Sequence, residues 1–385
     1  MTNVNKCSNN CANHVANNCA NYFLPAEWAP QSAVIITWPH QNTDWGSILD
    51  RVEPVFIEIS KAICQQQQLI IVADNHALKH HICQLLTAAN VALEQVHCVI
   101  ANTDDTWARD HGPITLIEST CRDGNEVNDT DKAPKSKLLN FTFNGWGNKF
   151  AAKQDNAINL ALYHQLSAQG LLQTSVLATL DFVLEGGAIE SDGCGHILTT
   201  SACLLNPNRN PSFDKMAIDA LLKKWFTAKK VLWLDHGELE GDDTDAHIDT
   251  LCRFAPDNRL VYVKCDDAND SHFEALEQME QQLANFTTSS GQPFELIPLP
   301  WPSAKYNQDS ERLPATYANY LIINNAVLVP TYQDAKDSIA LAQIAKAYPD
   351  RKIVGINCLP IIEQFGSLHC LTMQVPAQVE LSAIA

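Results

Sequence analysis

Four short polar motifs carry the residue types with which this chain could do chemistry. They occupy residues 104–113, 184–187, 242–249 and 366–370. Together they offer a thiol, an imidazole and several carboxylates. A deprotonated thiol is a nucleophile, an imidazole carries protons near neutral pH, and carboxylates bind cations. This inventory is typical of an enzyme that binds a cation and attacks it with a cysteine.

His247 and Asp249 lie two positions apart and follow an acidic run. On an extended strand, side chains two positions apart point to the same face, so this imidazole and this carboxylate could share a cleft. The preceding Asp242, Asp243 and Asp245 would make that cleft strongly negative. A His-x-Asp pair with nearby aspartates could also hold a metal, and a solvated acidic loop is the simplest alternative. Spacing alone leaves these interpretations open.

The other motifs are weaker signals when each is taken alone. Trp107 offers a π-face to a cation, and Asp110 offers the bidentate acceptor that a guanidinium fits, although Arg109 and Asp110 could equally form structural salt bridges. Glu185 precedes two glycines, which permit a close backbone approach but also occur in simple turns. Cys370 is one of 13 cysteines, most of which we expect in the core, and the preceding Gly and Ser favour a bend that exposes its thiol.

The elements that must position these motifs alternate between strands and helices. Apolar runs predict strands at residues 34–38, 69–72, 98–100, 114–117, 138–143, 182–184, 231–234, 260–263, 321–323, 327–329 and 353–356. Helical spacing predicts helices at residues 52–63, 78–86, 153–168, 213–227, 272–285 and 335–347. Asn75 is a candidate N-cap of the second helix, and residues 324–325 are a candidate tight turn. The charged residues 119–137 are expected to form a solvent-exposed hairpin insertion.

Hairpins and single helices are mixed, so the pattern does not predict a strict doubly wound parallel sheet. No Pro/Ser/Gly-rich linker follows residue 21, and we therefore expect a single catalytic domain at residues 21–385. Residues 1–20 are rich in Asn, Ala and Cys, and we expect them to form a disordered low-complexity tail, with a Cys/His metal-binding tract as the alternative. No internal repeat is detectable.

Composition excludes some classes of function. A net charge of −18 argues against nucleic acid as a partner and is compatible with a cationic substrate, although solubility alone would also explain it. The cysteines are scattered without Cys-x-x-Cys spacing, which favours a reducing cytosol over a disulfide scaffold. The sequence carries no signal-peptide pattern and no apolar run of membrane-spanning length. We therefore expect a cytoplasmic protein without membrane partners.

Taken together, the motifs resemble those of the agmatine deiminases and the related Porphyromonas-type peptidylarginine deiminases. The similarity runs from residue 23 to residue 376. It includes residues 24–28, 38–40, 107–113, 143–147, 185–187, 205–211, 243–249, 317–320 and 369–372. The resemblance implies an α/β fold, a five-bladed α/β propeller of the pentein type that guanidine-modifying enzymes use, with the active site at its central axis.

The resemblance also implies a reaction and its residues. Agmatine would be hydrolysed to N-carbamoylputrescine and ammonia through a covalent thiouronium intermediate, in polyamine (putrescine) biosynthesis. Catalysis would rest on five residues, namely Cys370 as nucleophile, His247 as proton carrier, Glu185 as the residue that orients His247, and Asp110 and Asp249 as holders of the guanidinium. Trp107 would line the substrate channel, and Glu27 would bind the distal amine. Neither a metal nor a cofactor is implied, and a homo-oligomer is expected.

Two positions depart from the family pattern. The family usually has glycine just before the His of the His-x-Asp motif, where this chain has Ala246, and a run of glycines before the His-Cys pair, where this chain has Phe365. Phe365 would narrow the backbone freedom and reshape the pocket near the nucleophile. The alternatives are a deiminase of arginine or peptidyl-arginine, a non-catalytic binder of guanidines or polyamines, and a hydrolase that uses a metal held by the aspartates.

Overall fold

A computed structural model describes residues 22–119 and 134–381. The expected tail at residues 1–20 and most of the expected insertion at residues 119–137 lie outside the described residues. The strands that flank this insertion do pair with each other in antiparallel fashion. No helix in the described part of the chain has the length and apolar character needed to cross a membrane.

Five sheets share one pairing pattern, in which an antiparallel pair is followed by a parallel pair. They are β5 (Ile114–Glu118), β6 (Ser136–Thr142) and β7 (Ser175–Val183); β8 (Ile189–Ser191), β9 (His196–Thr200) and β10 (Lys230–Leu234); β11 (Cys252–Ala255), β12 (Arg259–Lys264) and β13 (Glu295–Pro300); β16 (Leu321–Ile323), β17 (Ala326–Thr331) and β18 (Lys352–Asn357); and β19 (Thr372–Pro376), β2 (Gln31–Thr37) and β3 (Gln68–Ala73). β1 (Tyr22–Phe23) extends the first sheet beside β5, and β4 (Val96–Ile100) extends the last beside β3. A short hairpin pairs β14 (Lys305–Tyr306) with β15 (Arg312–Leu313).

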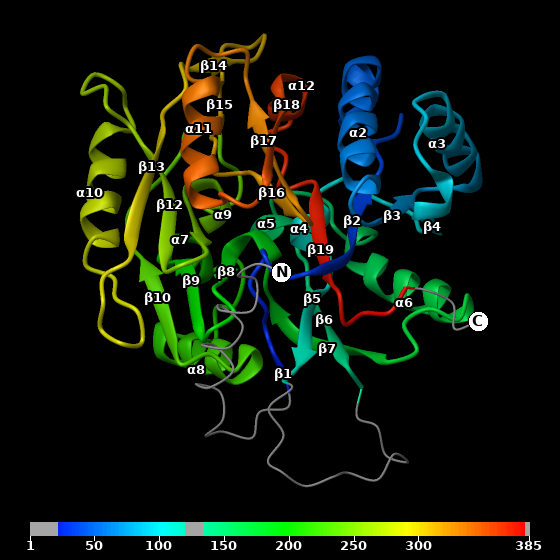
Figure 1. The fold of residues 1–385 in the computed structure, drawn as a ribbon, viewed down its shortest axis with the longest axis horizontal. Coiled ribbons are helices and arrows are strands. Elements are labelled where there is room, and N and C mark those ends of the chain that lie inside the picture. Colours follow the sequence, from blue (N-terminus) through cyan, green and yellow to red (C-terminus); the bar gives the residue numbers. More distant parts are fainter. Residues whose placement is uncertain (1–21, 120–133, 382–385) are drawn as a thin grey trace, which may run out of the picture.

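Longer helices connect the parallel strands, because a parallel pair needs a crossover. They are α6 (Ile158–Ala168), α8 (Lys215–Phe226), α10 (Phe273–Leu283), α11 (Asp337–Ala347) and α2 (Leu49–Cys64), one in each sheet unit, with α3 (His76–Ala88) between β3 and β4. In Figure 1 most of them lie toward the outside, whereas α4 (Ala108–His111) and α5 (Gly145–Asn148) lie near the centre. The remaining helical turns are η1 (Gly46–Ile48), η2 (Leu93–Gln95), η3 (Asp155–Ala157), η4 (Gly186–Ala188), α7 (Ser201–Leu204), α9 (Ile248–Leu251) and α12 (Leu359–Ile362).

The predicted helices are confirmed, with shifted ends. α2 buries Val52, Val55, Phe56, Ile59 and Ile63 along one face, as the helical spacing predicts. The side chain of Asn75 accepts the backbone N–H of Leu78, as expected of an N-cap.

Several strands were not predicted, and their sequences explain why. β11 contains Arg253, a buried charge that breaks its apolar pattern. β13 contains Pro298 and Pro300 and pairs on one side alone, and an edge position tolerates proline. The short β8, β9 and β19 are also missing from the sequence-based prediction. These strands complete the sheets whose pattern repeats, so the repeat could not be detected without them.

The repeated pattern places the polar motifs at equivalent positions. Asp110, Glu185, Asp249 and Cys370 each lie just before the first strand of a sheet unit, namely β5, β8, β11 and β19. Asn319 occupies the same position before β16. Five separate segments therefore approach one place in the molecule.

Candidate active site

Asp110, on α4, is a buried carboxylate held by two donors. The backbone N–H of Gly187 donates to Oδ1 at 3.0 Å, and the indole of Trp146 donates to Oδ2 at 3.0 Å. Burial raises the pKa of Asp110 to about 6, a rise that nearby His247 partly opposes. The carboxylate is fixed in orientation but is not paired with an arginine or a lysine.

His247 precedes α9 and is fully buried. Its Nδ1 lies 3.6 Å from Asp110 Oδ1, and neither ring nitrogen has a hydrogen-bond partner within the described residues. Burial alone would lower the pKa of His247, but Asp110, Cys203 and Glu185 outweigh it and raise the pKa to about 10. The imidazole therefore carries a proton at neutral pH and has a free N–H group to offer.

Asp249 stands in α9, two residues after His247. His369 Nδ1 lies 2.7 Å from its Oδ2, while Oδ1 is buried without a hydrogen-bond partner among the residues described. Burial by itself would raise the pKa of Asp249, but the hydrogen bond from His369 and the charges of His247 and Arg253 hold it below its usual value. Asp249 is thus an ionised carboxylate with one unused oxygen.

Cys370 is 4% exposed and lies beside Asp249. Its Sγ is 3.8 Å from Asp249 Oδ2 and 3.2 Å from Asn319 Nδ2, and Asn319 Oδ1 accepts the backbone N–H groups of His369 and Cys370. Burial, with the nearby carboxylates of Asp249 and Asp110, raises the pKa of the Cys370 thiol well above its usual range. Without a ligand the sulfur is therefore a thiol.

Because Gly187 has no side chain, it leaves a space between His247, Asp110 and Asp249. A Cβ at this position would lie 2.6 Å from His247 Nδ1, 2.8 Å from Asp110 Oδ1 and 3.2 Å from Asp249 Oδ2. The φ angle of Gly187 is not positive, so its backbone conformation does not require glycine. The close approach of three site residues does.

A pocket of about 200 Å³ leads to Cys370. Its lining includes Trp107, Asp110, Trp146, Phe150 and Phe365, with the further carboxylates Asp44, Asp105 and Asp243. Asp105 accepts the indole N–H groups of Trp45 and Trp107, and this fixes the aromatic wall. The structure therefore brings Trp107, Asp110 and Cys370, which the sequence analysis singled out, into a single pocket.

Glu185 differs from its expected arrangement. It was expected to orient His247, yet both of its oxygens accept Arg209 Nε, at 2.9 and 3.1 Å. A carboxylate oxygen of Glu185, Cys203 Sγ and a ring nitrogen of His247 lie within 4.8 Å of one another. The charge of Glu185 thus contributes to the raised pKa of His247, and the described residues show no hydrogen bond between the two. Arg209 also binds Asp245 Oδ2 at 2.7 Å and so holds the loop that precedes His247.

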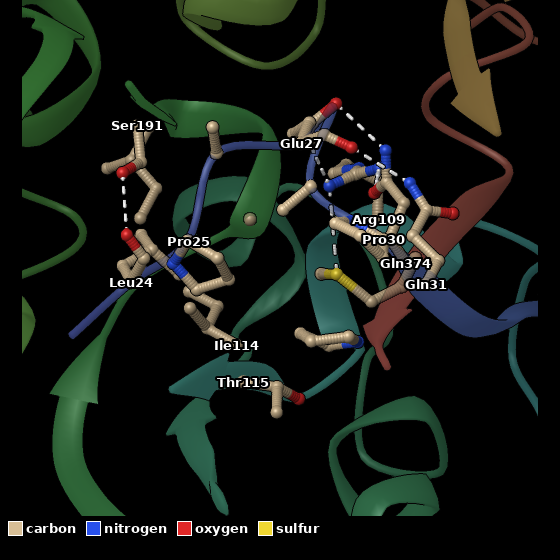
Figure 2. Close-up of a pocket in the computed structure, with 16 residues that line it drawn as sticks. Leu24, Pro25, Glu27, Pro30, Gln31, Arg109, Ile114, Thr115, Ser191 and Gln374 are labelled. Atoms are coloured by element: carbon tan, nitrogen blue, oxygen red, sulfur yellow. Dashed lines mark hydrogen bonds and ion pairs between the residues drawn. The ribbon is translucent and has the colours of Figure 1, made fainter. Parts of the chain in front are cut away.

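Glu27 lies outside the pocket that contains Cys370. Figure 2 shows it in a second cavity, of about 70 Å³, where it points toward Arg109 and Gln374. Arg109 Nη1 binds its Oε1 at 3.0 Å, Gln374 Nε2 donates to its Oε2 at 2.8 Å, and Arg253 also pairs with Oε2. The structure therefore places Glu27 away from the pocket that contains Cys370, with its charge already matched by Arg109 and Arg253.

Two groups of described side chains have the composition of a metal site. They are Glu185, Cys203 and His247, and Glu27, Glu190 and His369. In the first group Arg209 binds Glu185, and in the second Arg253 binds both glutamates. A guanidinium thus already supplies the positive charge that a metal would bring.

Several residues of the site were not found from the sequence alone. Asn319 and Trp146 were noted merely as parts of longer motifs, and Arg209, Arg253 and His369 received no role. Each binds a site residue through geometry that joins distant segments, and no local pattern reports such contacts. Their presence in the motifs on which the family resemblance rests is the one signal that could have indicated Asn319, Trp146, Arg209 and His369.

Chemically, the pocket lining offers the Cys370 thiol and the Asp110 carboxylate, and the fully buried His247 and Asp249 lie directly behind these two residues. No arginine or lysine is among its lining residues in the described part of the chain. A planar cation bound between Asp110 and Asp249 would place its centre beside Cys370 Sγ and would supply the missing positive charge.

Comparison with known proteins identifies relatives over nearly the whole chain. Residues 23–376 match the sequence model of the family described as Porphyromonas-type peptidyl-arginine deiminase. The agmatine deiminase of Medicago truncatula is 29% identical to the chain, over 92% of this chain and 96% of its own length.

Solved structures agree with this match. An agmatine deiminase of C. jejuni with substrate bound is 35% identical, with a TM-score of 0.80 over 92% of this chain and 96% of its own. A Porphyromonas gingivalis protein, whose assignment as an arginine deiminase is provisional, is 44% identical, with a TM-score of 0.81 over 93% of this chain and 99% of its own.

Proposed function

The chain belongs to the Porphyromonas-type peptidyl-arginine deiminase family, and from this premise we propose that it hydrolyses agmatine to N-carbamoylputrescine and ammonia. The observation that carries the proposal is a contrast in charge. Glu27 and Glu185, outside the pocket, are bound by arginines, whereas Asp110 and Asp249 beside Cys370 are not. A cationic substrate would complete the pocket.

The first half of the reaction forms a covalent intermediate. The Cys370 thiolate attacks the central carbon of the guanidinium, and a C–S bond forms. His247 donates its proton to one nitrogen of the tetrahedral adduct, the C–N bond breaks, and ammonia leaves. Asp110 and Asp249 hold the remaining nitrogens, and the product of this half is a thiouronium group on Cys370.

The second half reverses these roles. His247, now neutral, takes a proton from water, and the hydroxide attacks the thiouronium carbon. The C–S bond breaks, the hydroxyl proton of the adduct passes to solvent, where the released ammonia takes it up, and the neutral ureido product leaves. Cys370 returns as a thiolate beside a protonated His247. Glu185 supports the cationic form of His247 through its charge, in agreement with the raised pKa of that imidazole.

Substrate binding also supports thiolate formation. In the free protein, burial and two aspartates raise the pKa of Cys370. A guanidinium between Asp110 and Asp249 opposes that negative potential and so lowers the pKa of the thiol. The nucleophile is therefore activated when the correct charge is bound.

Agmatine fits the pocket better than arginine on electrostatic grounds. The lining carries Asp44 and Asp243 in addition to Asp110, and these two are the candidates for the distal ammonium in place of Glu27. The α-carboxylate of arginine would enter the same acidic surroundings without a partner. Arg109 is unsuited to bind it, because it pairs with Glu27 in the second cavity.

Deimination of free arginine is the second candidate, and one observation favours it. The Porphyromonas gingivalis relative that is provisionally assigned as an arginine deiminase has the highest identity of the two structures compared. Both substrates share the guanidinium chemistry, so the distinction depends on the end of the pocket away from Cys370.

We further propose that the five sheet units form the blades of a five-bladed propeller, with the pocket at its axis. The equivalent placement of five site segments before β5, β8, β11, β16 and β19 supports this arrangement. The expected place of the reaction is putrescine biosynthesis in the cytoplasm, with the enzyme as a homo-oligomer.

A single substitution tests the chemistry. Cys370→Ala should abolish ammonia release from agmatine while leaving agmatine binding and the melting temperature nearly intact. Cys83→Ala, which removes a half-buried thiol on α3, is the matched control and should keep full activity. Mass spectrometry of acid-quenched samples should detect the adduct in the wild type and not in Cys370→Ala. Substantial turnover by Cys370→Ala would show that Cys370 is not the nucleophile.

A further inference from the structure

A buried polar network joins Asp249 to the second cavity. His369 stands in its middle and is 1% exposed. Its Nδ1 lies 2.7 Å from Asp249 Oδ2, and its Nε2 faces Arg253 and Glu27. Figure 2 shows the far end of this network, where Glu27, Arg109 and Gln374 converge. The mechanism above uses none of these residues directly.

Arg253 determines which nitrogen of His369 carries the proton. Arg253 Nη2 lies 2.9 Å from His369 Nε2, and a guanidinium has protons to donate but no lone pair to accept with. The contact with Arg253 therefore favours the tautomer in which Nε2 accepts and the single ring proton on Nδ1 is donated to Asp249, over the tautomer in which Nε2–H would be donated to Glu27 at 3.0 Å. The pKa of His369 is lowered, first by burial and then by Arg109 and Arg253, which agrees with a neutral ring.

Arg253 itself has little freedom to move. It is fully buried, and its Nη1 donates to the carbonyl oxygens of Ala318 and Tyr320, at 3.1 and 2.8 Å. It also forms ion pairs with Glu27 and Glu190. The two oxygens of Glu27, which lie 3.0 Å from His369 Nε2, are satisfied by Arg109, Arg253 and Gln374.

The consequence falls on Asp249. Its Oδ2 accepts the Nδ1–H of His369, and its Oδ1 has no partner in the described part of the protein. A carboxylate held at one oxygen keeps its plane fixed and leaves the other oxygen for a ligand. A third group that orients a catalytic group through a hydrogen bond is a known device in triad-type sites.

We propose that His369 is a positioning residue, whose Nδ1–H group orients the Asp249 carboxylate toward the substrate guanidinium, with Arg253 setting the tautomer. This inference rests on the proposed function and deepens it. His369 would act through Asp249 without touching the substrate.

A pair of substitutions separates positioning from packing. His369→Leu removes the donor, whereas His369→Asn retains an N–H group close to the position of Nδ1. We expect kcat/KM for agmatine to fall at least tenfold in His369→Leu, and most of this loss to be recovered in His369→Asn. Thermal melting of both variants reports on packing.

The acid limb of the kcat/KM profile is the readout that packing alone would not move. The charged and titratable groups that face Asp249 are His369, His247, Asp110, Cys370 and Arg253. Loss of the His369 hydrogen bond should raise the pKa of Asp249, so that a second protonation steepens the acid limb set by Asp110 in His369→Leu, whereas His369→Asn should keep the wild-type limb. Equal losses in both variants, with the wild-type acid limb, would overturn the proposal.

Neutron diffraction of the wild-type protein keeps the proposal testable if the variants fail to fold. Deuterium at His369 Nδ1 with a bare Nε2 is expected, and deuterium at Nε2 would overturn the proposed tautomer. Failure of the proposed function would appear differently, as an inactive wild-type enzyme. Failure of this inference would appear as an active wild type with indistinguishable His369 variants.

Discussion

Ala246 and Phe365 adopt backbone conformations that favour glycine. Their φ angles are 64° and 63°, in the left-handed region, where a Cβ costs about 1–2 kcal/mol per residue. The sequence analysis singled out both positions because the family usually has glycine there, and the structure supplies the reason. Phe365 also lines the pocket, as expected. Strain of this kind persists where the surroundings impose it, and here it borders His247 and the loop before Cys370.

Gly187 is required because of its close contacts and not because of its backbone angles. Gly187→Ala would place a methyl group 2.6 Å from His247 Nδ1 and 2.8 Å from Asp110 Oδ1, in the space where the guanidinium and His247 must meet. We expect kcat/KM for agmatine to fall at least 100-fold, because misplacement of about 1 Å costs that much. Steady-state kinetics and melting curves check this. Ala188→Gly, at the next position, is the control for altered backbone freedom. Near-normal kinetics in Gly187→Ala would show that the space is not used.

The pKa values at the site predict a bell-shaped activity profile. Below about pH 6 Asp110 is protonated and cannot hold the guanidinium, so kcat/KM should rise as the pH increases through about 6. Above about pH 10 His247 loses the proton that the leaving ammonia needs, so activity should fall again. A kcat/KM profile from pH 5 to 11 measures both limbs. Asp110→Asn should lack the limb near pH 6, and an unchanged limb in that variant would contradict its assignment to Asp110.

The residue types of the site were largely predictable from the sequence, but their partners were not. Asp110, Asp249, His247 and Cys370 do lie together, as the resemblance implies. Glu27 lies in the second cavity, and a carboxylate in a motif gives no indication of the arginines that neutralise it. These arginines, Arg109 and Arg253, lie 82 and 226 positions further along the chain, so the pairs depend on the fold.

At the scale of elements, residues 364–368 form a loop that covers Trp107. A Cβ on Gly366 would lie 2.3 Å from the Trp107 ring, and that ring is held by its hydrogen bond to Asp105 and its contact with Trp45. The loop therefore requires glycine at position 366, although the neighbouring Phe365 stands where the family usually has glycine.

Gly366→Ala should displace either the Trp107 ring or the loop that carries Cys370. We expect kcat/KM for agmatine to fall at least tenfold, with a change in tryptophan fluorescence, because the aromatic wall of the pocket moves. Gly355→Ala, in β18, adds a methyl whose nearest contact is 3.0 Å away and which does not line the pocket, so it serves as the control. Kinetics that match this control would exclude a role for the close contact with Trp107.

Individual elements were predicted best where the buried apolar side chains lie along one face of the element. α2 shows a clear helical face, whereas β11 hides a buried charge and β13 carries prolines. Sequence patterns report the burial of local side chains, and these strands are stabilised by partners far along the chain. Arg253 illustrates the point, because its charge is matched by Glu27 and Glu190 in other elements.

For the whole molecule, the repeated sheet pattern explains how scattered motifs meet. Each unit delivers one segment to the site just before its first strand, and the units share pairing geometry without shared residues. The fold class came from the resemblance, since strand spacing predicted neither the repeat nor the number of sheets. The net charge of −18 acts at the same scale, because an acidic molecule attracts a dication such as agmatine more strongly than a substrate with an added carboxylate.

The most direct test is a comparison of kcat/KM for agmatine, free arginine and a peptidyl-arginine at one pH and ionic strength, with ammonia release as the readout. Agmatine should be preferred over arginine by at least about 100-fold, because an unpaired carboxylate in an acidic pocket costs several kcal/mol. Cys370→Ala should be inactive on all three. Equal kcat/KM for agmatine and arginine would contradict the agmatine assignment and leave the deiminase chemistry standing. The absence of ammonia release from every substrate would contradict the account as a whole.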